Sequence, residues 1–367
     1  MPRRLAFACC AAVAIAGCST PSAPPPHSTR AVTSSAPGSP STTVRPSASP
    51  TGGVRVLPPR PPVSAAWQQL DRQAASLAPS VAVVAGQVLP DGRLQLVHRS
   101  GPTDARPLAS VVKLYVLLAV ADQVRSGALR WDSPLRLQDV DRAGGSGSLG
   151  GRATGSTVTV QEAARLMIHI SDNTATDLLM RTVGQPALAK AVAASGHSDP
   201  TRLSPFPTIR QDLWLEWSSS PAAVAARRSW AGASPSQRAG LLRTADTSPP
   251  ADLSAAVPRW QQGFGYFATA TDIAVAHVLL HRASKERGLA PLRAILHNPD
   301  VAIVQPPSWR YTAYKSGAVA GVQNGSWYAE TARGDQVLVV LASSPGSVSP
   351  ARFTALASNA AGVLSRS

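Results

Sequence analysis

The chain has 367 residues, of which 44% are hydrophobic and 15% are charged, and its formal net charge is +15. This composition is typical of a globular protein and excludes a wholly disordered chain. The first 64 residues hold six arginines and no acidic residue, which leaves +9 for the remainder. Because this excess is arginine scattered without a basic run or an aromatic RNA-binding pattern, we expect no nucleic-acid partner.

The first eighteen residues have the pattern of a signal peptide. The basic pair Arg3-Arg4 precedes an apolar run over 5–16, which is shorter than a membrane-spanning helix. Residues 15–18 resemble a bacterial lipobox, in which cleavage exposes Cys18 for attachment of a lipid. We therefore predict an exported protein, anchored through Cys18 to the outer face of the cytoplasmic membrane. An ordinary secretory peptide cut nearby is the alternative, and the arginine pair fits both Sec and twin-arginine export.

The cysteine and histidine content limits the chemistry. All three cysteines lie at or before position 18, so the rest of the chain has no thiol for a disulfide, a metal or catalysis. The seven histidines show no metal-ligand spacing. We expect no metal and no cofactor.

Residues 19–64 are rich in Ser, Thr, Pro and Ala and hold few large apolar side chains. Such a segment cannot bury a core and is stiffened by its prolines, so it is predicted to be a disordered, extended spacer. The folded domain is expected over residues 65–367.

The pattern of the domain predicts helices and strands in a definite order. A helix is expected over 65–77, followed by strands over 81–88 and 94–98, three helices in the middle of the chain, three strands and a last helix. This order predicts an α+β fold, in which an antiparallel sheet built from both chain termini is flanked by helices and stands beside an all-helical lobe. A site is expected in a cleft between sheet and lobe. The later predicted elements are helices over 111–124, 160–170 and 174–183, strands over 311–316, 323–331 and 336–342, and a helix over 351–364.

Ser110 and Lys113 open the first helix of the middle block, one turn apart on one face. A serine hydroxyl becomes a nucleophile when a neighbour takes its proton, and a partly buried lysine can do so because burial lowers its pKa. The chain has only four lysines, and arginine fills its ordinary basic positions. Arginine cannot release a proton, which gives a chemical reason for a lysine at 113.

Two further polar triplets follow along the chain. Ser171-Asp172-Asn173 lies between two helices, where Ser171 can pass a proton to a leaving group and Asn173 can hold a substrate carbonyl; a plain helix cap is the alternative. Lys315-Ser316-Gly317 ends a predicted strand, where Lys315 offers a cation to a substrate carboxylate. Gly317 would let a substrate approach the strand, and the Ala318 N–H would join that of Ser110 in holding an oxyanion.

The ordered motifs S-x-x-K, S-D-N and K-S-G resemble those of class A β-lactamases and penicillin-binding proteins. The resemblance covers residues 65–367 and implies the β-lactamase/transpeptidase-like fold. It also implies catalytic roles for Ser110, Lys113 and Ser171, and substrate or oxyanion contacts for Asn173 and residues 315–318.

One feature of that family is missing from its expected place. Class A enzymes carry an Ω-loop glutamate that activates the water for deacylation, but residues 202–213 contain no glutamate. The nearest carboxylates are Asp212 and Glu216, either of which is a candidate deacylation base, although a solvated loop acid or a helix N-terminal acid is the simpler interpretation.

The resemblance therefore predicts a monomeric β-lactamase-like serine hydrolase that acts on β-lactam-like amides through a Ser110 acyl-enzyme. Two alternatives remain: a penicillin-binding D-Ala-D-Ala peptidase or esterase with slow deacylation, acting on a small molecule or a peptidoglycan peptide, or a non-catalytic envelope lipoprotein. Trp214 and Trp217 are expected either to wall the cleft or to pack in the core.

Overall fold

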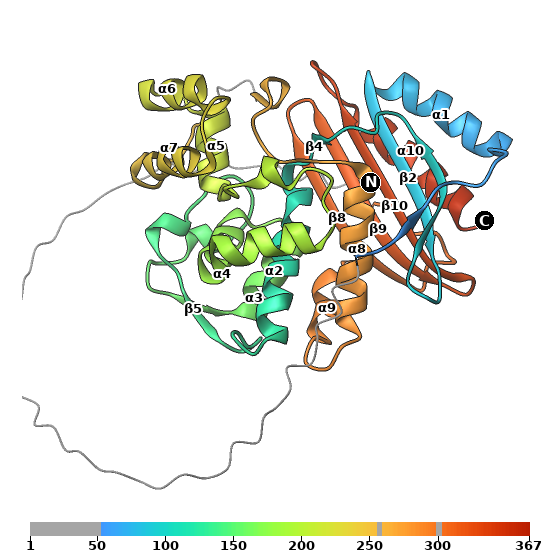
Figure 1. Cartoon of the computed structure of the whole chain (residues 1–367), viewed down its shortest axis with the longest axis horizontal. Coiled ribbons are helices and arrows are strands. Elements are labelled where there is room, and N and C mark those ends of the chain that lie inside the picture. Colours follow the sequence, from blue (N-terminus) through green and yellow to red (C-terminus); the bar gives the residue numbers. More distant parts are fainter. Residues whose placement is uncertain (1–52, 255–258, 299–302) are drawn as a thin grey trace, which may run out of the picture. The chain divides into compact units, whose positions relative to one another are not determined.

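A computed structural model describes residues 53–254, 259–298 and 303–367 (Figure 1). The predicted signal peptide, Cys18 and the spacer up to residue 52 lie outside the described residues. Within the described ranges, no helix is long and apolar enough to cross a membrane.

A six-stranded sheet contains strands from both ends of the chain, as predicted. Its order is β1-β3-β2-β10-β9-β8, with β1 parallel to β3 and every other neighbouring pair antiparallel. The pairing of β2 with β10 joins the N-terminal strands to the C-terminal ones, which leaves β8 at one edge. The strands are β1 Val56–Leu57, β2 Ser80–Val88, β3 Leu94–Ser100, β8 Tyr311–Val319, β9 Val322–Thr331 and β10 Gly334–Ser343.

The sheet begins earlier than the predicted domain boundary. Val56–Leu57 pairs with β3 although it lies in the segment predicted to be spacer, so the ordered chain starts before residue 65. This two-residue strand precedes Pro58-Pro59, and the prolines hid it from an analysis of periodicity.

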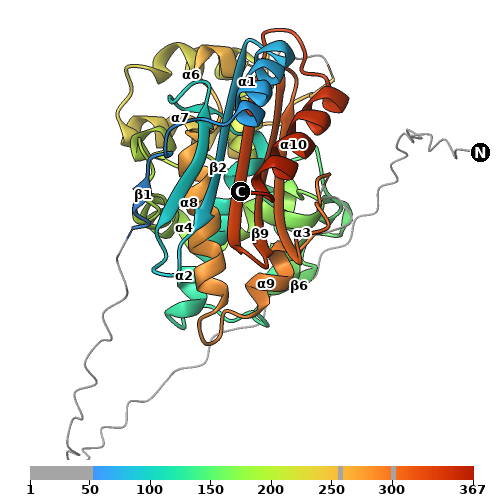
Figure 2. The same cartoon turned by 90° about the vertical axis from the view of Figure 1, so that its right-hand side faces the viewer.

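Apolar side chains alternate between the two faces of the sheet. On one face Val83 and Val340 pack against α1 and α10; on the other face Val84 and Val339 join the larger core beneath α8 (Figures 1 and 2). Because both faces are covered, β2 and β10 are apolar at successive positions over their middle parts.

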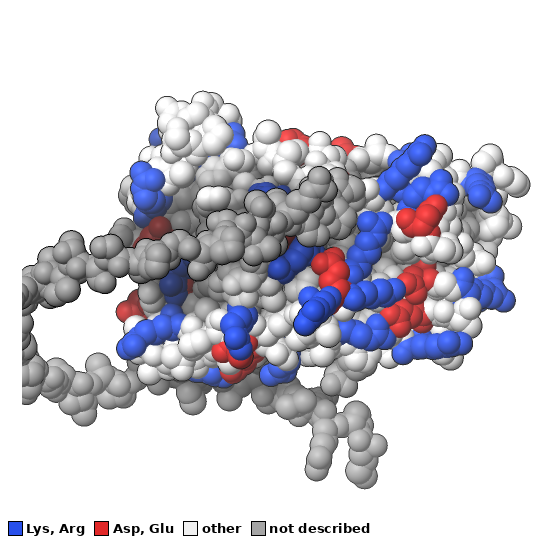
Figure 3. All heavy atoms as spheres, turned by 60° about the horizontal axis from the view of Figure 1, so that its bottom comes forward, with Lys and Arg blue, Asp and Glu red and all other residues white. Residues whose placement is uncertain are grey.

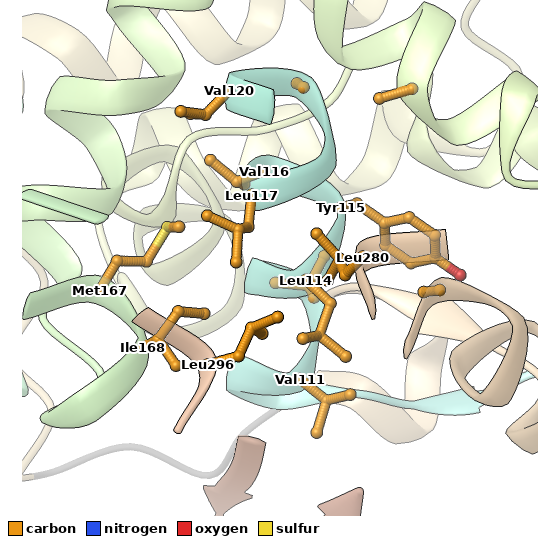
Figure 4. Packing of buried hydrophobic residues seen from close by; sticks show 14 of the residues in the cluster. Val111, Leu114, Tyr115, Val116, Leu117, Val120, Met167, Ile168, Leu280 and Leu296 are labelled. Atoms are coloured by element: carbon orange, nitrogen blue, oxygen red, sulfur yellow. The ribbon is translucent and has the colours of Figure 1, made fainter. Parts of the chain in front are cut away.

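Helix α2 is the central helix of the lobe. It is buried on most of its surface because α3, α4 and α8 pack around it (Figure 4). A helix that is apolar on all sides is stable only when other elements cover it. The packing around α2 also fixes the turn directly before this helix, which carries Ser110. The helices are α1 Ala65–Leu77, α2 Lys113–Arg125, α3 Val160–His169, α4 Asn173–Ala194, α5 Ile209–Trp217, α6 Pro221–Trp230, α7 Pro235–Thr247, α8 Ala270–Ser284, α9 Pro291–Leu296 and α10 Pro350–Leu364.

Helices α5, α6 and α7 share a small core of their own, which includes Trp214, Leu242 and Phe264. Two short two-stranded sheets complete the described structure: β4 Arg106–Pro107 with β7 Phe267–Ala268, and β5 Pro134–Arg136 with β6 Thr157–Thr159. Basic and acidic side chains lie next to one another on the face shown in Figure 3, in agreement with the dispersed charge of the sequence.

Candidate active site

Ser110 lies in a 3₁₀ turn, Ala109–Val112, directly before α2. The residue before it, Ala109, has a φ of 47°, a left-handed conformation that is strained for alanine. Asn324 of β9 holds this turn, because its buried amide donates to the carbonyls of Pro107 and Leu108 at 2.8 and 3.1 Å. Ser110 is half-buried and faces a cleft, so the fold presents its hydroxyl at a fixed position.

Lys113 is fully buried, and its ammonium nitrogen reaches the next motif. Nζ lies 2.5 Å from the main-chain oxygen of Ser171, 3.1 Å from Ser171 Oγ and 2.8 Å from Asn173 Oδ1. Among the described residues, Ser110 Oγ is not one of its hydrogen-bond partners. Burial, and then the neighbouring Lys315, hold the pKa of Lys113 well below its ordinary value, against the opposing effect of Asp177 and Asp172. A neutral Lys113 can accept a proton.

The Ser171-Asp172-Asn173 turn is held by its middle residue, which is buried. Asp172 accepts from the amides of Ser148 and Leu149 at 2.7 and 2.8 Å and caps α4 through Ala175 N–H at 2.8 Å. Ser171 itself has a φ of 55°. The helix-cap interpretation therefore holds for Asp172, while its two neighbours face Lys113.

The glycine-rich loop before α3 contributes a residue that sequence reasoning missed. Ser146 Oγ donates to Ser171 O at 2.9 Å, and Ser146 O accepts from Asn173 N–H at 2.9 Å. Gly147 makes this contact sterically feasible, since a Cβ there would lie 2.3 Å from the Asp172 Cγ. The signal in the sequence was the glycine-rich run over residues 144–151. Such a run predicts that the main chain approaches another segment closely, but it does not say which segment.

Lys315 lies on edge strand β8, opposite Lys113 across Ser171. Its Nζ is 3.1 Å from Ser171 Oγ and 2.8 Å from Ser316 O, and burial lowers its pKa to about 7. Gly317 has a packing role as well. A Cβ there would lie 2.3 Å from Leu108 O and 3.0 Å from Ser110 N, so glycine lets β8 pack against the Ser110 turn.

A cleft of about 340 Å³ opens in front of Ser110. Ser110, Ser146 and Asn173 line it on the lobe side, and Ala318 lines it from β8. Trp217 also lines the cleft, whereas Trp214 packs in the small core of α5–α7. The expectation of a cleft wall therefore holds for Trp217, and the expectation of core packing holds for Trp214.

Asp212 and Glu216 of α5 form a buried pair in the wall of the same cleft. They are only 7% and 5% exposed, which corrects the interpretation of either as a solvated loop acid. Burial raises the pKa of Asp212 to about 8 and that of Glu216 well above its ordinary range. The two side chains are hydrogen-bonded to each other, and two carboxyl groups can bond in this way only if one carries the proton. Asp212 Oδ1 and Glu216 Oε2 have no partner among the described residues.

Across the described ranges, no group of three His, Cys, Asp or Glu side chains is placed to hold a metal ion.

Comparison with solved structures identifies the fold. A mutant of PBP-A, titled as an acyl-enzyme complex with penicillin-G, matches with a TM-score of 0.57 and 16% identity over 85% of this chain and 100% of that one. A β-lactamase from Sphaerobacter thermophilus matches with a TM-score of 0.54 and 20% identity, over 82% of this chain and 95% of that one. A class A β-lactamase from Mycobacterium abscessus matches with a TM-score of 0.55 and 15% identity, over 81% of this chain and 98% of that one. The chain has a β-lactamase-like fold.

Sequence comparison agrees over part of the chain. Residues 87–244 match the family model described as "Beta-lactamase enzyme family". This segment contains Ser110, Lys113 and the Ser171 turn, whereas Lys315 lies outside it. No curated protein matches the chain. At these identities the solved structures establish the β-lactamase-like fold and leave the reaction to be argued from the site.

Proposed function

We propose that this protein is an exported serine hydrolase that attacks β-lactam-like amides through a Ser110 acyl-enzyme and releases the acyl group slowly at neutral pH. The observation that carries the proposal is the pair of buried lysines, Lys113 and Lys315, which both contact Ser171 Oγ next to the cleft that Ser110 lines. Two buried lysines with lowered pKa values are costly to a fold, and such groups cluster at catalytic sites.

Acylation begins with proton transfer from Ser110 to neutral Lys113. The Ser110 oxygen then forms a bond to the carbonyl carbon, and the carbonyl electrons move to its oxygen. The N–H groups of Ser110 and Ala318 are the expected donors to this oxyanion. The strained turn and the packing of β8 against it support the proposal, because both fix the Ser110 main chain before substrate binds.

Collapse of the tetrahedral intermediate breaks the carbon–nitrogen bond. Ser171 gives its hydroxyl proton to the leaving nitrogen and regains one from the Lys113 ammonium, across the 3.1 Å contact. This returns Lys113 to its neutral state and balances the protons. Protonated Lys315 binds the carboxylate of the substrate, and the amide of Asn173 binds a substrate carbonyl.

Deacylation needs a base for the attacking water, and the carboxyl groups in the cleft wall are largely protonated at pH 7. Asp212, with a pKa of about 8, is a poor base at neutrality. Slow release follows from this, and it favours the penicillin-binding alternative over rapid turnover. The comparison with PBP-A points the same way, since that structure is titled as an acyl-enzyme complex with penicillin-G.

A fluorescent penicillin tests the acylation step. We expect covalent labelling of the wild type with a mass increase of one probe, and none in Ser110→Ala. Ser236→Ala, at an exposed position of α7, serves as a folded control that retains the site and should still be labelled. An unlabelled wild type at high probe concentration would refute the proposal, and so would labelling that survives Ser110→Ala.

The lifetime of the labelled protein tests the deacylation step. If the Asp212–Glu216 pair is the base, the adduct should decay roughly tenfold faster at pH 9 than at pH 7, because the pair loses its proton through about pH 8. The double variant Asp212→Asn/Glu216→Gln should remove this acceleration while acylation persists. Decay that is rapid at pH 7 and identical in the variant would show that another group activates the water.

Export and lipidation at Cys18 form the remaining part of the proposal. The basic pair, the short apolar run and the lipobox-like residues support it. Growth of cells with a labelled fatty acid should mark the wild-type chain and not Cys18→Ala.

A further inference from the structure

A second pocket, of about 350 Å³, adjoins the cleft. We call it the arginine pocket, because Arg202, Arg227 and Arg238 line it together with Trp230 and Phe267. It is separated from the cleft by a shared wall of Asp212, Phe264 and Gly265, which line both cavities.

The three guanidinium groups are held in place by main-chain oxygens and aromatic rings. Arg227 Nη1 donates to Leu215 O and Ser218 O at 2.8 and 2.9 Å. Arg238 Nε donates to Trp230 O at 3.1 Å, and its guanidinium lies 5.3 Å from the centre of the Trp230 ring. Within the described chain, these bonds leave Arg227 Nη2 and both Arg238 Nη atoms without an acceptor.

Arg202 completes the arrangement at the mouth of the pocket. Its guanidinium lies 5.4 Å from the centre of the Phe267 ring, and Nε is 3.3 Å from Asp199 Oδ2. A guanidinium stacked on a ring keeps its in-plane N–H groups free for an oxyanion, which is why arginine is common in such sites.

The positive charge of the pocket is poorly balanced. Arg227 and Arg238 have no carboxylate partner within 4 Å in the described part of the chain. Asp212 is the one carboxyl group among the described lining residues, and burial keeps it largely protonated at neutral pH. Burial and the nearby Arg259 lower the pKa of Arg227, as expected for a desolvated cation beside a like charge. An anion would remove this repulsion.

We propose that the arginine pocket binds an oxyanion group, carboxylate or phosphate, of a ligand whose apolar part packs on Trp230 and Phe267. Arg227 and Arg238 supply the free N–H donors, and Arg202 closes the mouth. The proposal does not depend on the reaction at Ser110. It identifies a second ligand site next to the catalytic cleft.

The test titrates the full-length protein with inorganic phosphate or citrate at constant ionic strength, while thermal unfolding and tryptophan fluorescence are recorded. We expect a saturable rise in Tm with at least one anion, and the anion that saturates identifies the group. The double variant Arg227→Gln/Arg238→Gln should weaken binding at least about tenfold. The variant Arg228→Gln/Arg243→Gln removes the same charge from exposed positions of α6 and α7 and should bind as the wild type does.

Two further measurements keep the outcome decisive. Arg238→Gln alone leaves the Arg227 contacts to Leu215 and Ser218 intact, so it tests the site even if the double variant unfolds. Ser110→Ala should retain anion binding, which separates this proposal from the proposed function. The absence of saturable binding to either anion in the wild type, or equal weakening in the exposed-charge control, would overturn the proposal.

Discussion

At the scale of single residues, the two buried lysines are expected to differ in charge. Lys113 is lowered in pKa by burial and by Lys315, whereas burial alone lowers Lys315, to about 7. Because the two ammonium groups repel each other, loss of the proton from one favours its retention by the other. The site can therefore hold a neutral base at 113 and a cation at 315 at the same time, as the proposed reaction requires.

This difference predicts a bell-shaped pH profile for acylation by a carboxylate-bearing probe. The second-order rate should rise as Lys113 loses its proton and fall above about pH 7 as Lys315 loses its own. The two apparent pKa values of this profile will describe Lys113 and Lys315 together rather than either lysine alone. Stopped-flow measurement of labelling by a fluorescent penicillin from pH 5 to 9 gives the profile.

Lys315→Arg and a neutral substrate separate the two limbs. Arginine stays charged over this range, so the falling limb should disappear even if the rate is lower. A neutral activated ester has no carboxylate to bind, and the wild type should then show only the rising limb. A falling limb that survives both changes would mean that Lys315 does not bind the carboxylate.

Motif residues and their supports were not equally predictable. Ser110, Lys113 and Lys315 could be identified because their chemistry restricts the residue type and their order along the chain is informative. Ser146 and Asn324 could not, since a serine in a glycine-rich loop and an asparagine in a strand are common, and their contacts exist only after the chain has folded. The burial of Glu216 was missed for a similar reason, because a segment distant in sequence, which includes Arg259 and Gly265, packs against it.

At the scale of elements, the site depends on how closely β8 approaches the turn before α2. Gly317 is the point of contact. Gly317→Ala should push β8 away from Ser110, lower the acylation rate at least about tenfold and destabilise the protein by about 1–3 kcal/mol. Gly151→Ala is the matched control, since a Cβ at position 151 meets nothing within 4 Å and its φ is not positive.

Labelling kinetics and thermal unfolding report the two effects separately. A Gly317→Ala protein that acylates at the wild-type rate would show that the contact between β8 and the turn does not position Ser110.

Periodicity predicted β2, β3, β8, β9 and β10 and the helices α1 and α10 on one face of the sheet, because their apolar faces repeat every two residues or every three to four. Helices α5 to α9 escaped prediction. Helix α6 buries only Ala223 and Ala226, so its apolar stripe is narrow, whereas α8 is buried at most of its positions and has no polar face to mark it. For α6 and α7, the capping serines and prolines, Ser220-Pro221 and Ser234-Pro235, were the available signal.

At the scale of the whole molecule, the acidic pair connects the cleft to the stability of the fold. Asp212 and Glu216 have raised pKa values in the folded state, so folding favours their protonated forms. This contribution is fully present below their unfolded pKa values near 4 and is lost as the pH rises through about 8. Stability should therefore fall across this window, and the pair should account for part of the fall.

The double variant Asp212→Asn/Glu216→Gln should flatten this dependence. Amides keep a hydrogen bond between the two side chains but carry no charge, so the variant should gain on the order of 2 kcal/mol relative to the wild type between pH 5 and 8. Thermal unfolding at each pH measures the difference. The control variant Asp132→Asn/Glu286→Gln removes two acids that are more exposed than Asp212 and Glu216. Asp132 pairs with Arg130 and Glu286 pairs with Arg125, and this variant should not flatten the dependence of stability on pH. If the buried variant follows the wild-type curve in parallel, the pair ionises in the folded protein as it does in the unfolded chain, and its use as a base with a pKa near 8 must be abandoned.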